Sequence, residues 1–366
     1  MLERLDIENF RAFKKLTMPE LARINLISGK NNAGKTALLE SIQLHVSEFS
    51  HEALHNILEE REEFFTKSVS RENLTPLKHF FYGHKINPDN SRLTISSNLD
   101  THTLDIGRSF VVKDGESYSR QFEKLPFEEA MLMADEDDET VSVLLFSSQS
   151  SPKELAPLFD NGQLDMNLRR RMRMSKDFIP VNFVPSNGIN MQSLANLWDR
   201  ISLTSLEDHV LAGLQIIEPR ITGITFVQSG RAASNRIPVV KLSHVDEPVT
   251  LRSLGDGMSR IFHIILSLVN SEDGILLIDE FENGLHWSVQ KSIWKVIFEL
   301  SKKHNIQIFA TSHSNDCIAS FSAIWEEDVS NAIFYRVEAK SEGYVEAISY
   351  KLKDLDDALD FDIEVR

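Results

Sequence analysis

The sequence predicts an α/β fold with a mainly parallel sheet, an antiparallel β subdomain and an inserted α+β lobe. From residue 177 onward, short apolar strand-like runs alternate with helical segments, which is typical of a parallel sheet covered by helices. Near the N-terminus, the apolar run 24–29 ("INLISG") leads into a glycine-rich turn and an apolar helix. This order of strand, glycine turn and helix is the second observation that favours an α/β fold.

Three segments follow from these patterns. Residues 1–48 form the N-terminal part of the main domain, with strands at 2–9 and 13–18, the strand 24–29 and a helix at 35–46. Residues 49–175 form the inserted lobe, and residues 176–366 complete the main domain. The C-terminal part is expected to contain helices at 193–201, 205–217 and 288–304, strands at 221–228, 237–243, 274–280 and 306–313, and two closing strands and a helix within 331–359.

The inserted lobe has a looser pattern. A charged helix is expected near 55–68, followed by strand-like pieces at 92–98, 102–107 and 109–115 and by an acidic run at 134–139. No heptad repeat continues through the lobe, which argues against a long coiled-coil arm.

Composition narrows the classes of function. The net charge of −16 argues against a surface that binds nucleic acid over its whole extent, although a local basic patch can still touch DNA. The single cysteine, Cys317, excludes an internal disulfide framework and is expected to be a small buried residue. The N-terminal "MLERLDIENF" lacks the pattern of a signal peptide, and no apolar run is long enough to span a membrane. We therefore expect a cytoplasmic protein without a membrane partner.

Residues 29–36 ("GKNNAGKT") match the phosphate-loop pattern GxxxxGK[ST] between an apolar strand and a helix. The glycines turn successive N–H groups toward a phosphate, Lys35 reaches the β- and γ-phosphates, and Thr36 offers a hydroxyl to Mg²⁺. The expected ATP-binding residues of this loop are Gly29, Lys30, Asn31, Asn32, Ala33, Gly34, Lys35 and Thr36.

The run "ILLIDE" at 275–280 supplies two carboxylates at the end of a buried strand. Asp279 is expected to join Thr36 in holding Mg²⁺, and Glu280 to orient and polarise the attacking water. His313 follows the next apolar strand, and its predicted place at the same sheet edge favours a contact with the γ-phosphate over a structural role.

The segment 251–264 ("LRSLGDGMSRIFHI") sets a serine and two glycines before an apolar helix, which suits a second anion seat. A helix start that is only capped by Ser253 or Asp256 explains the same pattern.

The order of phosphate loop, serine-glycine segment, "ILLIDE" and histidine resembles the ABC-type ATPase head of P-loop NTPases. The start "LDIENFRAFKKLTM" is similar to the RecF, SMC and OLD-like ATPases, and "DEFENGLH" resembles the OLD-like branch, often described as AAA-type ATP-binding proteins. The likeness covers residues 1–48 and about 180–366. The 53 residues after His313 (366 minus 313) are short for the nuclease domain of larger OLD-like relatives, which implies a branch without one.

The resemblance implies a homodimer with two ATP molecules at its interface. Ser253 and Gly255 of one subunit would face the γ-phosphate bound to the phosphate loop of the other, although Leu254 replaces the usual middle glycine. Residues Glu282 to His286 would link the two sites, with His286 where transporter-type heads usually carry aspartate. A Mg²⁺-sensing glutamine is expected between residues 75 and 150, with Gln121 and Gln149 as candidates.

Two basic features have open interpretations. Arg11 could lie near the nucleotide, as basic residues of the first hairpin do in this family, or at a solvated strand end. The run "RRRMR" at 169–173 could touch nucleic acid or a partner, but a solvated helix face is favoured.

The resulting function is an ATP-hydrolysing, ATP-gated dimer switch in DNA maintenance or anti-phage defence, working with a separate effector such as a nuclease. Alternatives are a nucleotide-gated scaffold with little turnover, or a metal-dependent nuclease that uses the acidic tail around Asp357. A membrane-transporter ATPase and a hexameric AAA-plus machine are disfavoured, the first by the long insertion and altered signature, the second by the serine-glycine segment.

Overall fold

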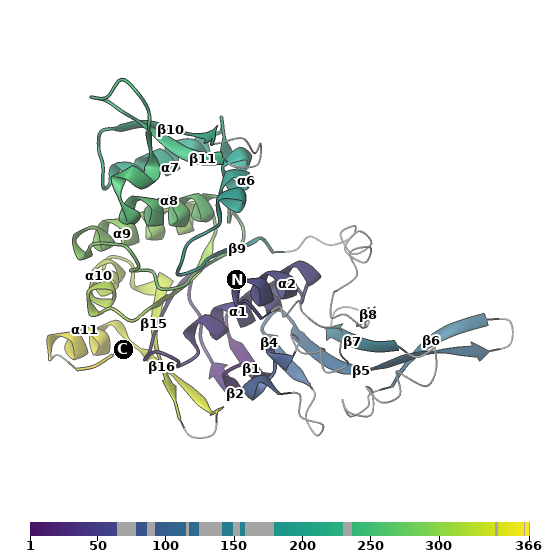
Figure 1. The fold of residues 1–366 in the computed structure, drawn as a ribbon. Coiled ribbons are helices and arrows are strands. Elements are labelled where there is room, and N and C mark those ends of the chain that lie inside the picture. Colours follow the sequence, from purple (N-terminus) through teal and green to yellow (C-terminus); the bar gives the residue numbers. More distant parts are fainter. Residues whose placement is uncertain are drawn as a thin grey trace.

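The structure is a computed structural model and describes residues 1–63, 78–85, 92–114, 117–123, 141–148, 154–157, 179–229, 236–340, 343–361 and 363–365. It contains three sheets: a six-stranded central sheet, a seven-stranded antiparallel sheet and a small three-stranded sheet (Figure 1). No helix within the described ranges is long and apolar enough to cross a membrane.

The central sheet has the strand order β16-β15-β3-β14-β13-β9. Five of its strands are parallel, and only β16 runs antiparallel. This confirms the mainly parallel sheet. Its strands are β3 (Ile24–Ser28), β9 (Val181–Val184), β13 (Ile275–Ile278), β14 (Gln307–Ser312), β15 (Ala332–Ala339) and β16 (Val345–Tyr350).

Alternate residues of these strands face two separate cores. On β13, Leu276 and Ile278 pack into one apolar cluster, whereas Ile275 and Leu277 pack into the other. Side chains of a strand alternate between its faces, so a strand covered on both sides must be apolar throughout. This explains the uninterrupted apolar run before Asp279.

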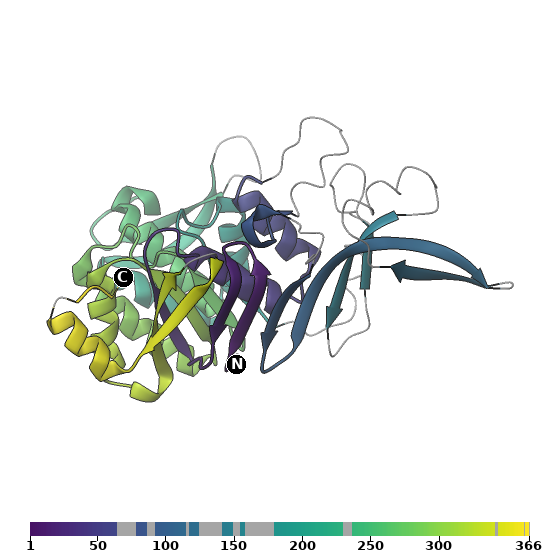
Figure 2. The same cartoon turned by 90° about the horizontal axis from the view of Figure 1, so that it is seen from below.

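Helices cover both faces of the central sheet (Figures 1 and 2). The first core joins one face to the C-terminal helices, and the second joins the other face to the N-terminal helices and the antiparallel sheet. The helices of the first side are α6 (Met191–Ile201), α7 (Ser205–Gln215), α8 (Asp256–Val269), α9 (Trp287–Lys303), α10 (Asn315–Trp325) and α11 (Leu352–Asp360). Those of the second side are α1 (Lys35–Val46) and α2 (His51–Glu60).

The seven-stranded sheet joins the N-terminal hairpin to later strands in the order β2-β1-β4-β5-β7-β8, with β6 beside β5. The pieces expected at 102–107 and 109–115 form one strand, β5, which with β6 extends away from the body (Figure 2). Its strands are β1 (Leu5–Phe10), β2 (Phe13–Met18), β4 (Leu93–Ser97), β5 (Thr101–Asp114), β6 (Ser117–Glu123), β7 (Val141–Ser148) and β8 (Glu154–Pro157).

The segment 49–175 begins as part of this N-terminal layer. Its strand β4 pairs with β1, and Leu54, Ile57 and Leu93 share a core with residues of α1. The lobe is therefore joined to the N-terminal segment by both sheet pairing and packing. The acidic run 134–139 and the basic run 169–173 lie outside the described residues.

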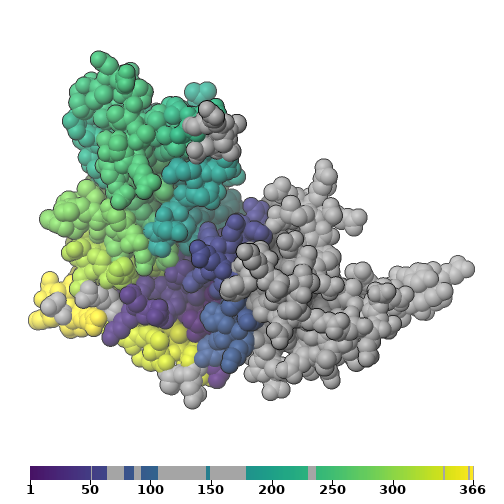
Figure 3. Space-filling view, viewed as in Figure 1, coloured from purple at the N-terminus to yellow at the C-terminus, as the bar shows by residue number. Residues whose placement is uncertain are grey.

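The three-stranded sheet consists of β10 (Ile221–Gln228), β11 (Arg236–Leu242) and β12 (Val249–Thr250), all antiparallel. With α6 and α7 it forms the end of the molecule that is coloured teal to green in Figure 3. It leads directly into α8 through a short 3-10 helix, η3 (Leu251–Leu254).

Candidate nucleotide site

The glycine-rich turn lies between β3 and α1, as expected. Gly34 has a φ of 93°, and a Cβ there would lie 2.7 Å from the Phe13 ring. A Cβ on Gly29 would lie 2.5 Å from the Val337 carbonyl oxygen. Both positions therefore require glycine, and Gly34 precedes α1 without a side-chain capping bond. A helix start of this kind directs N–H groups toward an anion.

Lys35 folds back over this loop. Its Nζ donates to the Gly29 carbonyl at 2.6 Å and to the Lys30 carbonyl at 3.1 Å. Burial lowers the pKa of Lys35, and the nearby carboxylates of Asp279 and Glu280 oppose that shift. The ammonium is held where a phosphate seated in the loop would meet it.

The pairing of β3, β14 and β13 brings the segments that follow these three strands together. Strand β14 lies between β3 and β13, with Ser312 opposite Ser28 and Ala310 opposite Ile278. Because these strands are parallel, the phosphate loop, the two acids and the histidine all follow the carboxyl edge of one sheet.

Asp279 is the centre of the polar contacts at this edge. It accepts from the Thr36 hydroxyl at 2.8 Å through Oδ2 and from the Thr311 hydroxyl at 2.6 Å through Oδ1. The structure thus joins the two residues predicted to hold a metal ion, and their oxygen atoms suit a hard divalent cation such as Mg²⁺. A role for Thr311 was not predicted from the sequence, because a polar residue at the end of a strand is common.

Glu280 has a left-handed backbone, with a φ of 48°. Its N–H donates to the Thr311 hydroxyl at 2.8 Å, and its Oε2 accepts from Asn283 Nδ2 at 2.7 Å. A non-glycine residue in this conformation is strained and persists only where its surroundings hold it. The Glu280 carboxylate therefore contacts Asn283, whereas that of Asp279 contacts Thr36 and Thr311.

His313 lies just past β14 and is oriented by Glu282. Its Nδ1 is 3.0 Å from Glu282 Oε1, and its backbone N–H donates to the same oxygen at 2.8 Å. The half-exposed ring therefore has Nδ1 facing the Glu282 carboxylate. The role of Glu282 as the residue that positions His313 was not expected from the sequence.

The serine-glycine segment forms η3, Gly255 and the start of α8. Gly255 precedes α8 with a φ of 102° and without a side-chain capping bond, and the Ser253 hydroxyl donates to the Thr250 carbonyl at 2.7 Å. The alternative that Ser253 or Asp256 caps this helix is therefore wrong. Leu254, which replaces the usual glycine, packs against the main core, and a Cβ on Gly255 would meet nothing within 4 Å.

The start of α8 contacts the loop after Glu280 directly. A Cβ on Gly257 would lie 2.8 Å from the Gly284 carbonyl oxygen, so only glycine allows this approach. At the other end of the loop, His286 caps α9: its Nδ1 accepts from the Ser288 N–H at 3.4 Å and faces the Ser288 hydroxyl at 2.7 Å. The histidine thus supplies a helix cap, as aspartate commonly does.

Arg260 connects α8 to the acidic strand end and was missed in the sequence. Its guanidinium donates to the carbonyls of Pro185 and Asp279, both at 2.6 Å, and of Glu280 at 3.0 Å. Burial lowers its pKa to about 10 despite the neighbouring carboxylates. An arginine within the apolar run "MSRIFHII" was the available signal, because a buried charge needs specific partners.

Replacing Arg260 by methionine should destabilise the fold by about 2 kcal/mol, because charge-assisted hydrogen bonds are lost and carbonyls are left unpaired. Chemical denaturation measures this change. The exposed Arg252 in η3 gives the matched control, and Arg252→Met should change the free energy of unfolding by less than about 0.5 kcal/mol. Equal stability of the two variants would contradict the role of Arg260.

Arg11 lies in the turn between β1 and β2 and is only 5% exposed, so a solvated strand end is wrong. Its Nε lies 2.8 Å from Glu40 Oε2 on α1, and its two terminal nitrogens donate to Glu63 at 2.9 and 3.0 Å. The next two residues, Ala12 and Phe13, pack on Gly34. A nucleotide contact by Arg11 stays a prediction.

Three other candidates remain apart from the site or outside the described parts. The side chain of Gln121, on β6, and the whole of Gln149 lie outside the described residues. Asp357 is exposed on α11, and no metal-binding cluster occurs in the described part of that helix. Cys317 is buried, as expected.

The fold and the residues at the carboxyl edge of the central sheet define a P-loop ATPase of the ABC and SMC-like type. The chain belongs to the AAA ATPase domain family, which matches residues 1–236 and 189–318. It is 24% identical over 356 residues to an ATP/GTP phosphatase from Helicobacter pylori, covering 89% of each chain. A shorter match of 67 residues is 40% identical to the DNA replication and repair protein RecF of Teredinibacter turnerae and covers 18% of each chain.

Two solved structures share the fold. One is an SMC head bound to the C-terminal winged-helix domain of ScpA, with 12% identity, a TM-score of 0.52, and 96% of this chain and 98% of that chain covered. The other is an SMC head with an extended coiled coil, bound to the C-terminal domain of ScpA derived from Pyrococcus furiosus, with 10% identity, a TM-score of 0.50 and 99% of each chain covered. The expected ABC-type head is thereby confirmed.

Proposed function

We propose that this chain is an ATP-driven switch in which two copies pair head to tail over two nucleotides and hydrolyse them. The observation that carries the proposal is the meeting of Thr36, Asp279, Glu280 and His313 at one sheet edge. The nucleotide phosphatase relative and the family of ATPase domains support hydrolysis.

The roles follow from the contacts. The loop Gly29 to Thr36 would cradle the phosphates, and Thr36 with Asp279 would hold Mg²⁺, which neutralises phosphate charge when bound. Glu280, fixed by Asn283, would accept a hydrogen bond from the attacking water and polarise it. His313, oriented by Glu282, would contact the γ-phosphate.

The pairing surface would be the exposed start of α8 with the loop from Glu282 to His286. This helix start has no side-chain cap and open space at Gly255, which suits the γ-phosphate of a partner's nucleotide. Trp287, 62% exposed beside His286, supplies the kind of aromatic anchor that protein interfaces favour.

Light scattering of Glu280→Gln tests the pairing. With ATP and Mg²⁺ the variant should shift from monomer to dimer, because bound ATP is retained and links the two copies. Without ATP it should stay monomeric. A monomer under both conditions, in a variant that still binds ATP, would contradict the proposed switch, and a dimer without ATP would show that nucleotide does not control pairing.

The proposed biological role is DNA maintenance or anti-phage defence in the cytoplasm, with a separate effector such as a nuclease. The match to a DNA replication and repair protein over 67 residues supports the link to DNA. The division into residues 1–48, 49–175 and 176–366 belongs to the same proposal, with 49–175 as the lobe that meets the effector. Cross-linking of the intact chain to its neighbours in cells, followed by mapping of the linked residues, tests that assignment: an effector linked only outside 49–175 would contradict it.

A further inference from the structure

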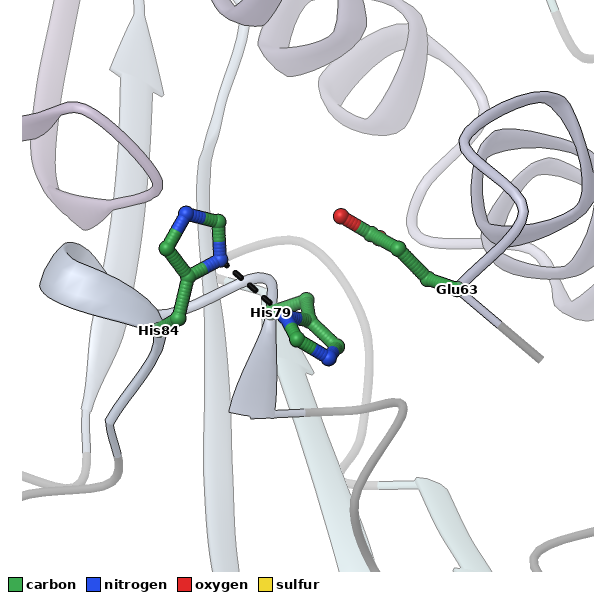
Figure 4. A group of neighbouring side chains, drawn as sticks. All are labelled: Glu63, His79 and His84. Carbon is green, nitrogen blue, oxygen red and sulfur yellow. Dashed lines mark hydrogen bonds between the residues drawn. The ribbon is translucent and has the colours of Figure 1, made fainter. Parts of the chain in front are cut away.

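Two histidines and a glutamate gather beside the N-terminal hairpin. His79 Nδ1 and His84 Nδ1 are 3.1 Å apart, and one ligand atom each from Glu63, His79 and His84 lies within 4.8 Å of the others. Figure 4 shows the Glu63 carboxylate, which follows α2, pointing toward the two rings. Glu63 and His79 are half-buried, and His84 is exposed.

The backbone reverses sharply to bring His84 back to His79. Gly83 and His84 both have left-handed conformations, with φ values of 67° and 57°. The Gly83 N–H donates to the Arg11 carbonyl at 3.0 Å, which anchors the turn on the first hairpin. Two successive residues of this kind, one of them not glycine, are strained, and strain of this kind clusters at functional sites.

We propose that Glu63, His79 and His84 form a binding site for a transition-metal dication of the Zn²⁺ class. Nitrogen ligands bound to Zn²⁺ at about 2.0–2.1 Å in tetrahedral geometry lie roughly 3.3 Å apart, close to the spacing of the two ring nitrogens. Imidazole ligands select such ions over Mg²⁺, which prefers oxygen. Three protein ligands leave a fourth position for water or a partner.

One further feature agrees with a ligand bound at this cluster. His79 Nε2 is buried and has no hydrogen-bond partner among the described residues, so these residues leave one nitrogen of the ring unsatisfied.

Glu63 already forms an ion pair with Arg11, and this pair links the metal site to the nucleotide site. Each carboxylate oxygen has a second lone pair, so Glu63 can accept hydrogen bonds from Arg11 and also coordinate an ion. Arg11 also forms an ion pair with Glu40 on α1, the helix that begins at the end of the phosphate loop. The Glu63–Arg11 and Arg11–Glu40 contacts therefore connect an ion bound by Glu63 to the helix that would bind the nucleotide.

Zinc titration of the full chain by calorimetry, after treatment with a chelator and in excess Mg²⁺, tests the site. The wild type should bind a single Zn²⁺, and His84→Asn should weaken binding at least about 10-fold, since even residues that only support metal ligands contribute ~10–100-fold. Asparagine tolerates the left-handed backbone, so this variant should fold. His79→Gln should lose affinity in the same way.

Two controls separate this proposal from the proposed ATPase switch. His55→Asn alters a partly exposed histidine on α2 and should keep full zinc affinity. Lys35→Ala should lose nucleotide binding but also keep zinc affinity. No saturable zinc binding by the wild type, or wild-type affinity in His84→Asn, would overturn the metal site.

Discussion

Replacing Glu280 by glutamine should preserve ATP binding and slow ATP hydrolysis about 100-fold or more, the range expected when a general base is removed. Glutamine keeps the size of the side chain and can still meet Asn283, but it lacks the carboxylate charge that polarises water. Asp279 and Thr36 are unchanged, so the contacts that would hold the nucleotide and its metal ion remain.

Steady-state phosphate release measures turnover, and fluorescent ATP binding measures affinity separately. The matched control is Glu299→Gln on the exposed face of α9, which should hydrolyse ATP at the wild-type rate. Hydrolysis by Glu280→Gln at the wild-type rate would refute the role given to Glu280. A large loss of affinity in the same variant would instead show that Glu280 contributes to ground-state binding.

The parts of the site that were predictable from the sequence are those carried by local patterns. The phosphate loop depends on glycines at fixed spacing beside one strand and one helix, and Asp279 and Glu280 follow a single buried strand. Their meeting followed from a general property of parallel strands, whose carboxyl ends share an edge. The sequence does not give the order of the strands. The structure supplies it by placing β14 between β3 and β13.

The residues that were missed act through contacts between distant parts of the chain. Thr311 becomes significant only when β14 pairs beside β13, and Arg260 only when α8 packs near Pro185 and the end of β13. Nor could the sequence locate the cluster of Glu63, His79 and His84, because its geometry depends on a left-handed turn anchored to Arg11. His286 was recognised as an unusual residue, but its role as the cap of α9 required the structure.

Replacing Ser253 by arginine should leave a folded monomer that binds ATP but neither pairs nor hydrolyses at the normal rate. Turnover should fall about 100-fold, the lower end of the range for losing a donor that stabilises transition-state charge. Ser253 is exposed, and its hydroxyl donates to the neighbouring Thr250 carbonyl, so we expect the described part of the chain to accommodate a longer side chain there. The same side chain would stand before the uncapped start of α8 and keep a partner's γ-phosphate from its N–H groups.

The measurement uses Ser253→Arg alone for hydrolysis, and together with Glu280→Gln for light scattering with ATP and Mg²⁺. Ser330→Arg, also in an exposed 3-10 helix, is the control for the added charge and bulk, and it should pair and hydrolyse normally. If Ser253→Arg keeps the wild-type rate, the start of α8 does not complete a partner's site. If the double variant still dimerises while Ser253→Arg alone is inactive, the segment instead acts within its own chain, through the contact between Gly257 and Gly284 that joins α8 to the loop beside Glu280.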